Sequence, residues 1–308
     1  MRMARPRAPQ LIDWAVRRLI INADDFGLTA GVNRTVIELH QKGVLTSATL
    51  MARAAATDEA IGLALKAPQL GVGCHIVLVD GEPVLPAAEI SSLVERQTGR
   101  FDAKPGSFLR RLLLGGIRAS EIEAEAAAQI ALLQRRGLTL THIDTHKHLH
   151  MFPAVSRPLL RAARAAGIRA VRNPFEPAWS RRATSSAPLF RRMEVSMLQQ
   201  LEPAFQRIVA EEGFSTTDGA LGVLTTGTLD EWSLRSLLEN IPAGTWELVT
   251  HPGYNDDDLA NAHTRLRKSR EIERQALLAL SNTEGLELIS FAQLAARDAE
   301  SSINSAIK

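Results

Sequence analysis

The stretch LTLTHIDTHKHLHM, residues 138–151, holds four of the eight histidines in the chain together with one aspartate. These side chains occupy alternate positions: His142, Asp144, His146, His148 and His150. In an extended chain, residues two apart point to the same side, so the stretch is expected to present one face of imidazoles and a carboxylate. Such groups hold catalytic divalent metal ions. The alternative, an exposed polar strand without a role, is less favoured because alternate histidines add no packed face.

On both sides of this stretch, short apolar strands alternate with helices. About seven or eight strands are expected, among them residues 19–21 and 246–250. This alternation predicts the α/β class, as a single domain with parallel strands and a (β/α) barrel-like architecture. In such folds, functional groups gather where strands end. The expected strand ends carry polar clusters: Asp24-Asp25, His75, residues 144–150 and His251.

These clusters together could form a hydrolytic metal site. One aspartate and two histidines leave an open position on a metal ion for water or substrate. Asp24 and Asp25 are adjacent and should face different directions, so one could bind metal while the other acts as a general base. The simpler alternatives are a helix N-cap for the aspartates, a satisfied core residue for His75, and a turn cap for His251.

The composition is that of a globular protein in a reducing compartment. The chain has 308 residues, 45% hydrophobic and 23% charged, and its net charge of +2 gives no argument for nucleic acid. The single cysteine, Cys74, excludes an internal disulfide. No apolar run reaches the ~18 residues of a membrane span, and no secretory signal is visible, so a cytoplasmic location is expected. Residues 1–16 are expected to be an N-terminal extension, 17–298 the catalytic domain, and 299–308 a polar tail.

Four motifs carry a resemblance to a known family. INADDFGLTAGVN at 21–33, GVGCHIVLVDGEP at 71–83, THIDTHKHLHMFP at 141–153 and ELVTHPGY at 247–254 resemble the YdjC-like carbohydrate deacetylases. Within that family, the chain is most similar to the hopanoid-biosynthesis-associated branch called HpnK. The motifs occur in family order between residue 19 and about residue 255, and the combination of ADDFG with D-T-H-x-H-x-H is specific. Thr145 stands where the family usually has serine.

The resemblance implies a barrel-like hydrolase that uses one divalent metal to remove the N-acetyl group of an amino sugar. Zinc or magnesium is the expected ion, and manganese and cobalt also suit the ligands. Asp25, His75 and His146 would bind the metal, Asp24 would be the general base, and His251 the general acid. Further residues would contact the sugar or support the ligands: His148, His150 and Arg172.

Residues 176–214, here called the lip, are expected to select the substrate. The lip combines paired arginines (Arg181-Arg182 and Arg191-Arg192) with apolar side chains: Trp179, Leu189, Phe190, Met193 and Met197. If the substrate is an N-acetylglucosaminyl hopanoid lipid, the lip could meet the inner membrane as a peripheral contact. An ordinary helical insertion or a homodimer contact is the alternative.

Other functions compatible with these residues are kept in view. Soluble chitooligosaccharide-type sugars could replace the lipid as substrate. A metal-dependent phosphoesterase or amidohydrolase could use His146 and His148 as a ligand pair, although a phosphoesterase usually needs a second metal and more carboxylates. A non-catalytic sugar- or lipid-binding protein would keep the barrel without turnover. The presence of the full set of site residues argues against it: Asp24, Asp25, His75, His146 and His251.

Overall fold

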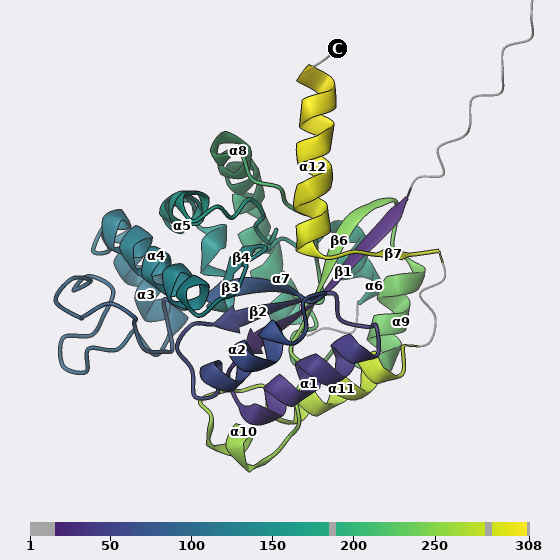
Figure 1. The fold of residues 1–308 in the computed structure, drawn as a ribbon, viewed down its shortest axis with the longest axis horizontal. Coiled ribbons are helices and arrows are strands. Elements are labelled where there is room, and N and C mark those ends of the chain that lie inside the picture. The colour runs from purple at the N-terminus through teal and green to yellow at the C-terminus, as the bar shows by residue number, and fades with distance from the viewer. Residues whose placement is uncertain (1–15, 185–188, 281–284, 307–308) are drawn as a thin grey trace, which may run out of the picture.

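The computed structural model describes residues 16–184, 189–280 and 285–306, and its centre is a parallel β-sheet (Figure 1). The strands lie in the order β4-β3-β2-β1-β6-β5, and β7 pairs with the start of β1. The bounds are β1 Arg17–Phe26, β2 Ser47–Met51, β3 Gly71–Ile76, β4 Ile143–Thr145, β5 Gly219–Leu221, β6 Gly244–Thr250 and β7 Glu287–Leu288. The predicted α/β class with parallel strands is confirmed, and the sheet has seven strands within the described residues.

An extended segment between the edge strands β4 and β5 curls the sheet into a barrel. On one side, the backbone N–H of Arg172 donates to the carbonyl of Ile143 in β4 at 3.1 Å. On the other side, the N–H of Val171 donates to the carbonyl of Ser215, just before β5, at 3.0 Å. These bridges connect the two edges, so the expected barrel-like architecture is present.

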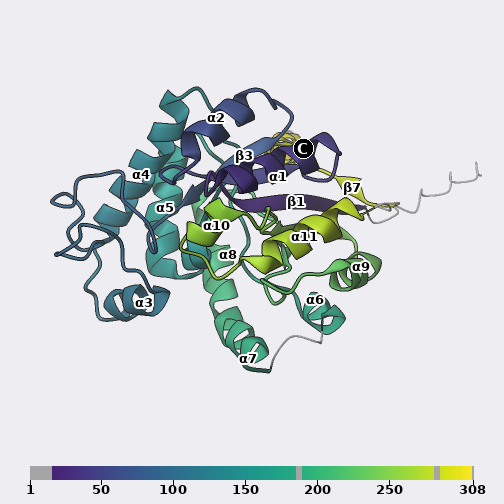
Figure 2. The ribbon, with the colours of Figure 1, turned by 90° about the horizontal axis from the view of Figure 1, so that it is seen from below.

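Helices cover the outer face of the sheet (Figures 1 and 2). Local signals start some of them: the Thr29 hydroxyl accepts a hydrogen bond from the N–H of Val32 and so caps α1. The α-helices are α1 Ala30–Gln41, α2 Thr57–Leu65, α3 Pro105–Leu113, α4 Ala119–Arg135, α5 Pro153–Ala165, α6 Ala178–Ala183, α7 Leu189–Leu198, α8 Glu202–Glu212, α9 Glu231–Glu239, α10 Asp257–Asn261, α11 Lys268–Leu278 and α12 Phe291–Ala306. Two 3₁₀ helices are η1 His146–Met151 and η2 Gln199–Leu201.

The core lies on both sides of the strands. All residues of β2 and of β3 are buried, as expected for parallel strands covered on both faces. Apolar side chains from helices complete it, for example Val36 and Leu39 of α1. The rigid sheet therefore fixes the positions of the groups at its carboxyl end.

The chain segments expected at the two ends and in the lip have the following structure. Residues 1–15 of the predicted extension lie outside the described part, and β1 begins at Arg17. The lip comprises α6, α7, η2 and α8, so it is mostly helical where it is described. Residues 299–306, assigned from the sequence to a polar tail, continue α12. Within the described residues, no helix is both long enough and apolar enough to cross a membrane.

Candidate active site

Five polar residues predicted from the sequence meet at the carboxyl end of the barrel. Asp24 and Asp25 lie at the end of β1, and His75 lies near the end of β3. His146 follows β4, and His251 follows β6. Asp24, Asp25 and His75 are buried, whereas the side chains of His146 and His251 keep 15% and 12% of their surface exposed. The two histidines are therefore the members of this group that reach solvent most.

The end of β1 departs from regular strand geometry, and this lets two successive aspartates serve one site. Asp25 has φ of 64°, in the left-handed region that residues other than glycine rarely adopt. The pairing of β1 with β2 shifts register between Ala23 and Phe26. In a regular strand, Asp24 and Asp25 would point to opposite faces. The irregularity turns Asp25 toward His75 without moving Asp24 away from the barrel interior.

Three side chains converge with the spacing of metal ligands. Asp25 Oδ1 lies 3.4 Å from His75 Nε2 and 3.3 Å from His146 Nδ1, and these two nitrogens are 3.2 Å apart. Ligand atoms at 2.0–2.1 Å from a tetrahedral centre would lie about 3.3–3.4 Å from one another. Asp25 Oδ1 is buried and has no hydrogen-bond partner among the described residues. The donor set and the unpartnered oxygen both fit a divalent metal ion.

Asp144 orients His75 for this role. Its Oδ1 lies 2.7 Å from His75 Nδ1, which leaves Nε2 directed at Asp25. Burial lowers the pKa of His75, but Asp144, then Asp25 and Asp24, raise it to about 10. The carboxylates around the ring therefore favour a positive charge at this point, which either a proton or a metal ion can supply.

Arg172 lies behind Asp24, without exposure to solvent. Its guanidinium donates to both oxygens of Asp24, at 2.6 and 2.8 Å, and also to Asp144 and Glu247. Burial acts to raise the pKa of Asp24, but Arg172, followed by His75, lowers it far below its usual range. Asp24 is therefore ionised at neutral pH and held in one position. Arg172 was expected to contact the sugar or to support the site, and its position fits only the supporting role.

His251 is the neighbour of Asp24 that reaches solvent. Its Nε2 lies 3.6 Å from Asp24 Oδ2, and its backbone N–H donates to Glu273 Oε2 at 2.5 Å. Burial is the main cause that lowers the pKa of His251 to about 4, against the opposing effect of Asp24 and Asp25. The imidazole is therefore neutral at neutral pH and lies beside an ionised carboxylate.

The histidine stretch is not extended over its whole length. β4 ends at Thr145, and His146–Met151 form a 3₁₀ segment in which Lys147 and His148 have φ of 59° and 53°. The expectation that all five side chains share one face is therefore wrong beyond Thr145. Two successive left-handed residues redirect the chain and remove the two-residue periodicity of a strand.

The four histidines of the stretch consequently have different surroundings. His142 is buried and stacks on Phe291 with ring centroids 3.9 Å apart. His150 is buried, and His148 is half-buried with its ring edge-to-face against that of His150. Of the four, His146 alone belongs to a possible metal-ligand group in the part of the chain that the structure describes.

A second set of possible ligands already surrounds a cation. Asp24, His75 and Asp144 also bring ligand atoms together, but Arg172 donates to both carboxylates. A metal ion there would have to displace a buried guanidinium, so the group that contains Asp25 is the better site. His148 belongs to neither group in the described residues, so the ligand pair considered for another hydrolase does not form.

Two charged residues at the site were missed by sequence reasoning. Arg270 of α11 donates to Asp25 Oδ2 and is 1% exposed, yet its segment resembles any charged helix. Glu247 did give a signal, as a charged residue inside the apolar strand WELVT. It accepts from Arg172 at 2.8 Å, and burial raises its pKa to about 7 although Arg172 acts to lower it.

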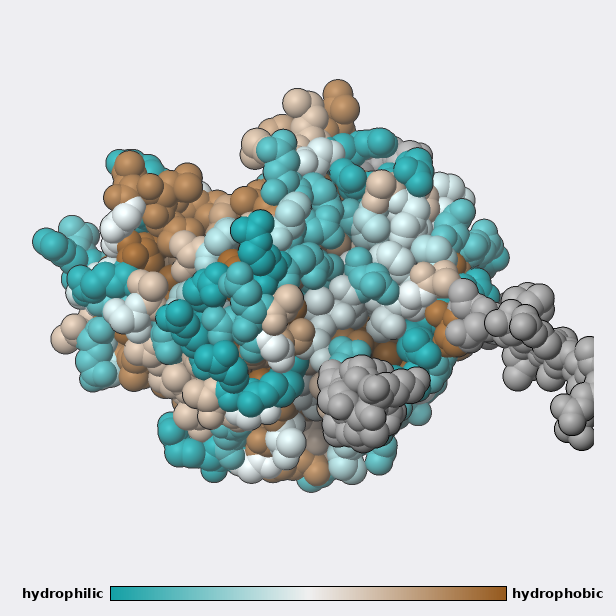
Figure 3. Space-filling view, turned by 90° about the horizontal axis from the view of Figure 1, so that it is seen from above, coloured by the Kyte–Doolittle hydropathy of each residue, from teal (hydrophilic) through white to brown (hydrophobic). Residues whose placement is uncertain are grey.

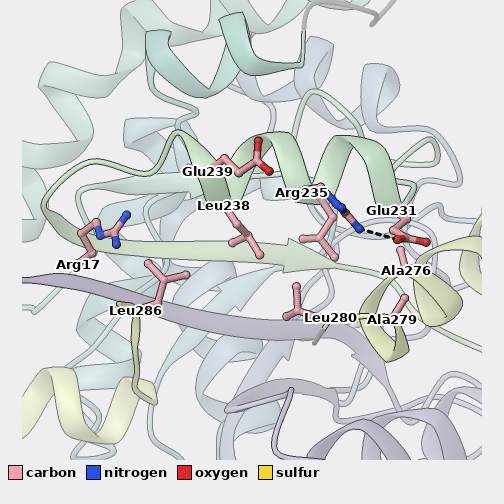
Figure 4. Close-up of a pocket in the computed structure, with 10 residues that line it drawn as sticks. Arg17, Glu231, Arg235, Leu238, Glu239, Ala276, Ala279, Leu280 and Leu286 are labelled. Carbon is pink, nitrogen blue, oxygen red and sulfur yellow. Dashed lines mark hydrogen bonds and ion pairs between the residues drawn. The ribbon is translucent and has the colours of Figure 1, made fainter. Parts of the chain in front are cut away.

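A cavity of about 290 Å³ lies elsewhere, between α9, α11 and the start of β1 (Figure 4). Leu238 and Leu286 line it, and an ion pair between Arg235 and Glu231 closes one part of it. Arg17, the first residue of β1, also lines it, so this cavity is at the opposite end of the barrel from Asp24. It contains none of the predicted site residues.

Comparison with known proteins gives one consistent family. A family model described as YdjC-like protein matches residues 18–287. A carbohydrate deacetylase of Brevibacillus brevis is 42% identical over 146 residues, which cover 47% of this chain and 55% of that protein. The match thus spans about half the length of this relative. A carbohydrate deacetylase of Oceanobacillus iheyensis is 30% identical over 270 residues, covering 88% of this chain and 100% of that protein.

A solved structure has the same fold over nearly the whole chain. It is a candidate cellobiose-phosphate cleavage protein from Enterococcus faecalis V583, with a TM-score of 0.72 and 25% sequence identity. The similarity covers 91% of this chain and 99% of that chain.

Proposed function

The chain belongs to the YdjC-like protein family, and from that premise we propose that it is a metal-dependent carbohydrate deacetylase. The reaction is hydrolysis of the N-acetyl group of an amino sugar, at a linear amide C–N bond. The observation that carries the proposal is the convergence of Asp25 Oδ1, His75 Nε2 and His146 Nδ1 within 3.2 to 3.4 Å of one another. The ionised carboxylate of Asp24 beside them supplies the base that hydrolysis needs.

Asp25, His75 and His146 are the proposed ligands of one divalent ion. One carboxylate and two imidazoles are a donor set that zinc accepts, and magnesium, manganese or cobalt would also suit it. When bound, the ion acts as a Lewis acid toward the acetamide carbonyl and lowers the pKa of water. Asp144 holds His75 in the orientation that this requires.

Asp24 and His251 are the proposed base and acid. Asp24 accepts a proton from water, the water oxygen bonds to the carbonyl carbon, and the C–N bond breaks as His251 protonates the leaving nitrogen. Because His251 is neutral at neutral pH, it must first receive the proton that Asp24 removed. The two side chains are 3.6 Å apart, so one water molecule or a small approach of the ring would complete this transfer. The products are acetate and the free amine. Arg172, bound to both oxygens of Asp24, fixes the base in place.

We also propose that the substrate is a glycolipid, an N-acetylglucosaminyl hopanoid. The resemblance of the sequence motifs to the hopanoid-associated branch supports this choice. Exposed apolar side chains on α7 of the lip support it independently, since a lipid substrate needs an apolar approach: Leu189, Phe190, Met193 and Met197. Deacetylation of soluble chitooligosaccharides is the alternative.

Acetate release tests both levels of the proposal. The protein is assayed with an N-acetylglucosaminyl hopanoid in detergent and with N,N′-diacetylchitobiose, in zinc and in excess chelator. Asp24→Asn should lose activity while still binding metal, and Asp58→Asn, on the surface of α2, is its control. Release from the hopanoid alone would support the lipid assignment, whereas release from chitobiose alone would discard it. Full activity in excess chelator would contradict metal dependence.

A further inference from the structure

One side of helix α7 is apolar and faces solvent. Leu189, Met193 and Met197 recur every four residues, and Phe190 lies beside them, so the four form one stripe along the helix. Their exposed fractions range from 64% to 80%. Val195, on the opposite side, is buried and packs against Leu224, which follows β5. The helix is therefore fixed to the barrel by one side and leaves its apolar stripe uncovered.

Arginines surround a cavity next to this stripe. The cavity, of about 220 Å³, lies between α6 and α7 and is lined by Arg181, Arg182 and Arg192, with Ser196 and Leu224. Arg181 Nη1 donates to Ser196 Oγ at 2.9 Å, while its Nε is buried without a hydrogen-bond partner in the described residues. Guanidinium groups arranged in this way fit an anion with several acceptor oxygens, such as a phosphate.

The charge of the segment matches such an anion. Residues 178–198 contain four arginines and one glutamate. That glutamate, Glu194, forms an ion pair with Arg191 at 2.8 Å, outside the residues that line the cavity. Two of these arginines lie on α6, and two lie on α7 together with Glu194, so the two helices present net positive charge beside the apolar stripe. Segments that bind anionic membranes combine the same two features.

A second apolar projection points to the same side of the molecule. Leu113 and Leu114, at the end of α3, are 81% and 75% exposed. Figure 2 places α3 and α7 at the same margin of the molecule, and Figure 3 shows hydrophobic side chains over both projections. Trp179, on α6 of the lip, does not join this exposed surface. Its ring packs edge-to-face on Trp246 and against the apolar core.

This surface lies at the same end of the barrel as the candidate active site. Leu224, which lines the arginine cavity, follows the carboxyl end of β5 by three residues. Asp24 and His251 stand at the carboxyl ends of neighbouring parallel strands. A body that contacted α7 would therefore face the end of the barrel where the metal ligands gather.

We propose that α7, the arginine cavity and the tip of α3 form a docking surface for an anionic lipid bilayer. The arginines bind lipid phosphates, and the stripe of α7 with Leu113 and Leu114 enters the interface between headgroups and acyl chains. The inference rests on the proposed function for its purpose, delivery of a glycolipid to the site, but docking is measured without turnover.

Vesicle flotation of the full chain with bound zinc tests this surface. The vesicles are phosphatidylcholine alone and an equimolar mixture with phosphatidylglycerol. Binding to the anionic vesicles should be stronger by roughly tenfold or more and should weaken as salt rises. Replacing Arg181, Arg182 and Arg192 together by Gln should remove most of this preference. Replacing Phe190 and Met193 by Gln should weaken binding to both kinds of vesicle.

Matched variants elsewhere on the surface serve as controls. The first control combines Arg135→Gln, Arg136→Gln and Arg235→Gln, which removes the same charge from α4, its C-cap and α9. The second combines Trp232→Gln and Ile272→Gln, which removes exposed apolar surface. These controls should leave flotation unchanged, and thermal melting followed by circular dichroism verifies that every variant is folded.

Several outcomes would overturn docking. One is equal flotation of wild type and arginine variant. Another is a higher melting temperature in inorganic phosphate together with no vesicle binding, which would indicate a site for soluble anions. A third is a smaller mass of the Phe190 and Met193 variant than of the wild type in analytical ultracentrifugation, again with no vesicle binding. That result would make the stripe an interface between two copies of this chain. Docking without acetate release from either sugar would refute the proposed function instead and leave docking standing.

Discussion

Arg270 donates a hydrogen bond to Asp25 Oδ2, and the other oxygen of the same carboxylate faces His75 and His146. Arg270 thereby selects which oxygen is offered to a metal ion. Burial acts to raise the pKa of Asp25, but Arg270, followed by the neighbouring His146 and His75, lowers it well below its usual range. The carboxylate is thus held ionised. The backbone of Asp25 is held in an otherwise unfavourable left-handed conformation.

Changing Arg270 to Gln should weaken metal binding. The carboxylate of Asp25 loses its fixed orientation and a compensating charge, and supporting contacts of this kind change metal affinity by about 10–100-fold. Competition with a chromophoric zinc chelator measures the affinity. Arg267→Gln, three residues earlier and exposed, is the matched control. Equal zinc affinity in both variants would show that Arg270 does not position the ligand.

Metal binding at neutral pH should release a proton from His75. With its pKa raised to about 10, the metal-free imidazole is protonated at neutral pH, and a metal ion must displace that proton. His146 contributes none, because burial lowers its pKa and keeps it neutral. Zinc titration calorimetry in buffers of different ionisation enthalpy should report release of about one proton. A binding enthalpy independent of the buffer would contradict the protonated state.

Asp144→Asn provides the companion experiment. Asp144 is the strongest of the groups that raise the pKa of His75, so the variant should release less of a proton on binding zinc. It should also bind zinc more weakly, since the ring loses the partner that directs Nε2 toward Asp25. If Asp144→Asn released as many protons as the wild type, the released proton would not come from His75.

Arg172→Met should destabilise the fold and do so more strongly as pH rises. It leaves Asp24, Asp144 and Glu247 buried without their shared cation, and breaking a buried ion pair costs about 3–5 kcal/mol. The pKa of Asp24 is lowered in the folded wild type, so its stabilising contribution is present above the unfolded pKa of about 4 and is lost as pH falls. Without Arg172, burial raises the pKa of Asp24, and ionisation then opposes folding.

Urea unfolding at about pH 5 and about pH 8 measures this effect. The difference in free energy of unfolding between wild type and Arg172→Met should be larger at the higher pH. Arg136→Met breaks an exposed ion pair with Asp58 and should cost no more than about 1 kcal/mol at either pH. If the loss in free energy of unfolding caused by Arg172→Met became smaller as pH rises, the three carboxylates around Arg172 would be excluded as its source.

The parts of the site that were predictable from sequence are those encoded in local motifs at strand ends. Asp24, Asp25, His75 and His251 could be placed together because apolar strands precede them and parallel strands end at one side of a sheet. Strand periodicity also singled out Asp144, as the carboxylate among the alternate histidines at positions 142–150.

Other parts depend on contacts that no local pattern contains. The left-handed conformations of Lys147 and His148 end the periodicity on which the shared face of histidines was predicted. Arg270 lies 245 residues from Asp25, on a helix whose sequence does not distinguish it from exposed neighbours. The role of Arg172 follows from the three carboxylates around it, which come from three separate strands. Such charge networks become visible only when the barrel is assembled.

Gly73→Ala should destabilise the protein through His142. A Cβ at Gly73 would lie 2.5–2.7 Å from three atoms of the His142 ring, which is buried and stacked on Phe291 and so has little room to move. Overpacking of this kind costs about 1–3 kcal/mol, measured as the loss in free energy of unfolding in urea. Gly62→Ala is the control, because it is helical with open space around its Cβ and should stabilise by about 0.5–1 kcal/mol. If Gly73→Ala were as stable as wild type, the ring of His142 would have to move freely, and its assignment as a fixed part of the barrel core would fail.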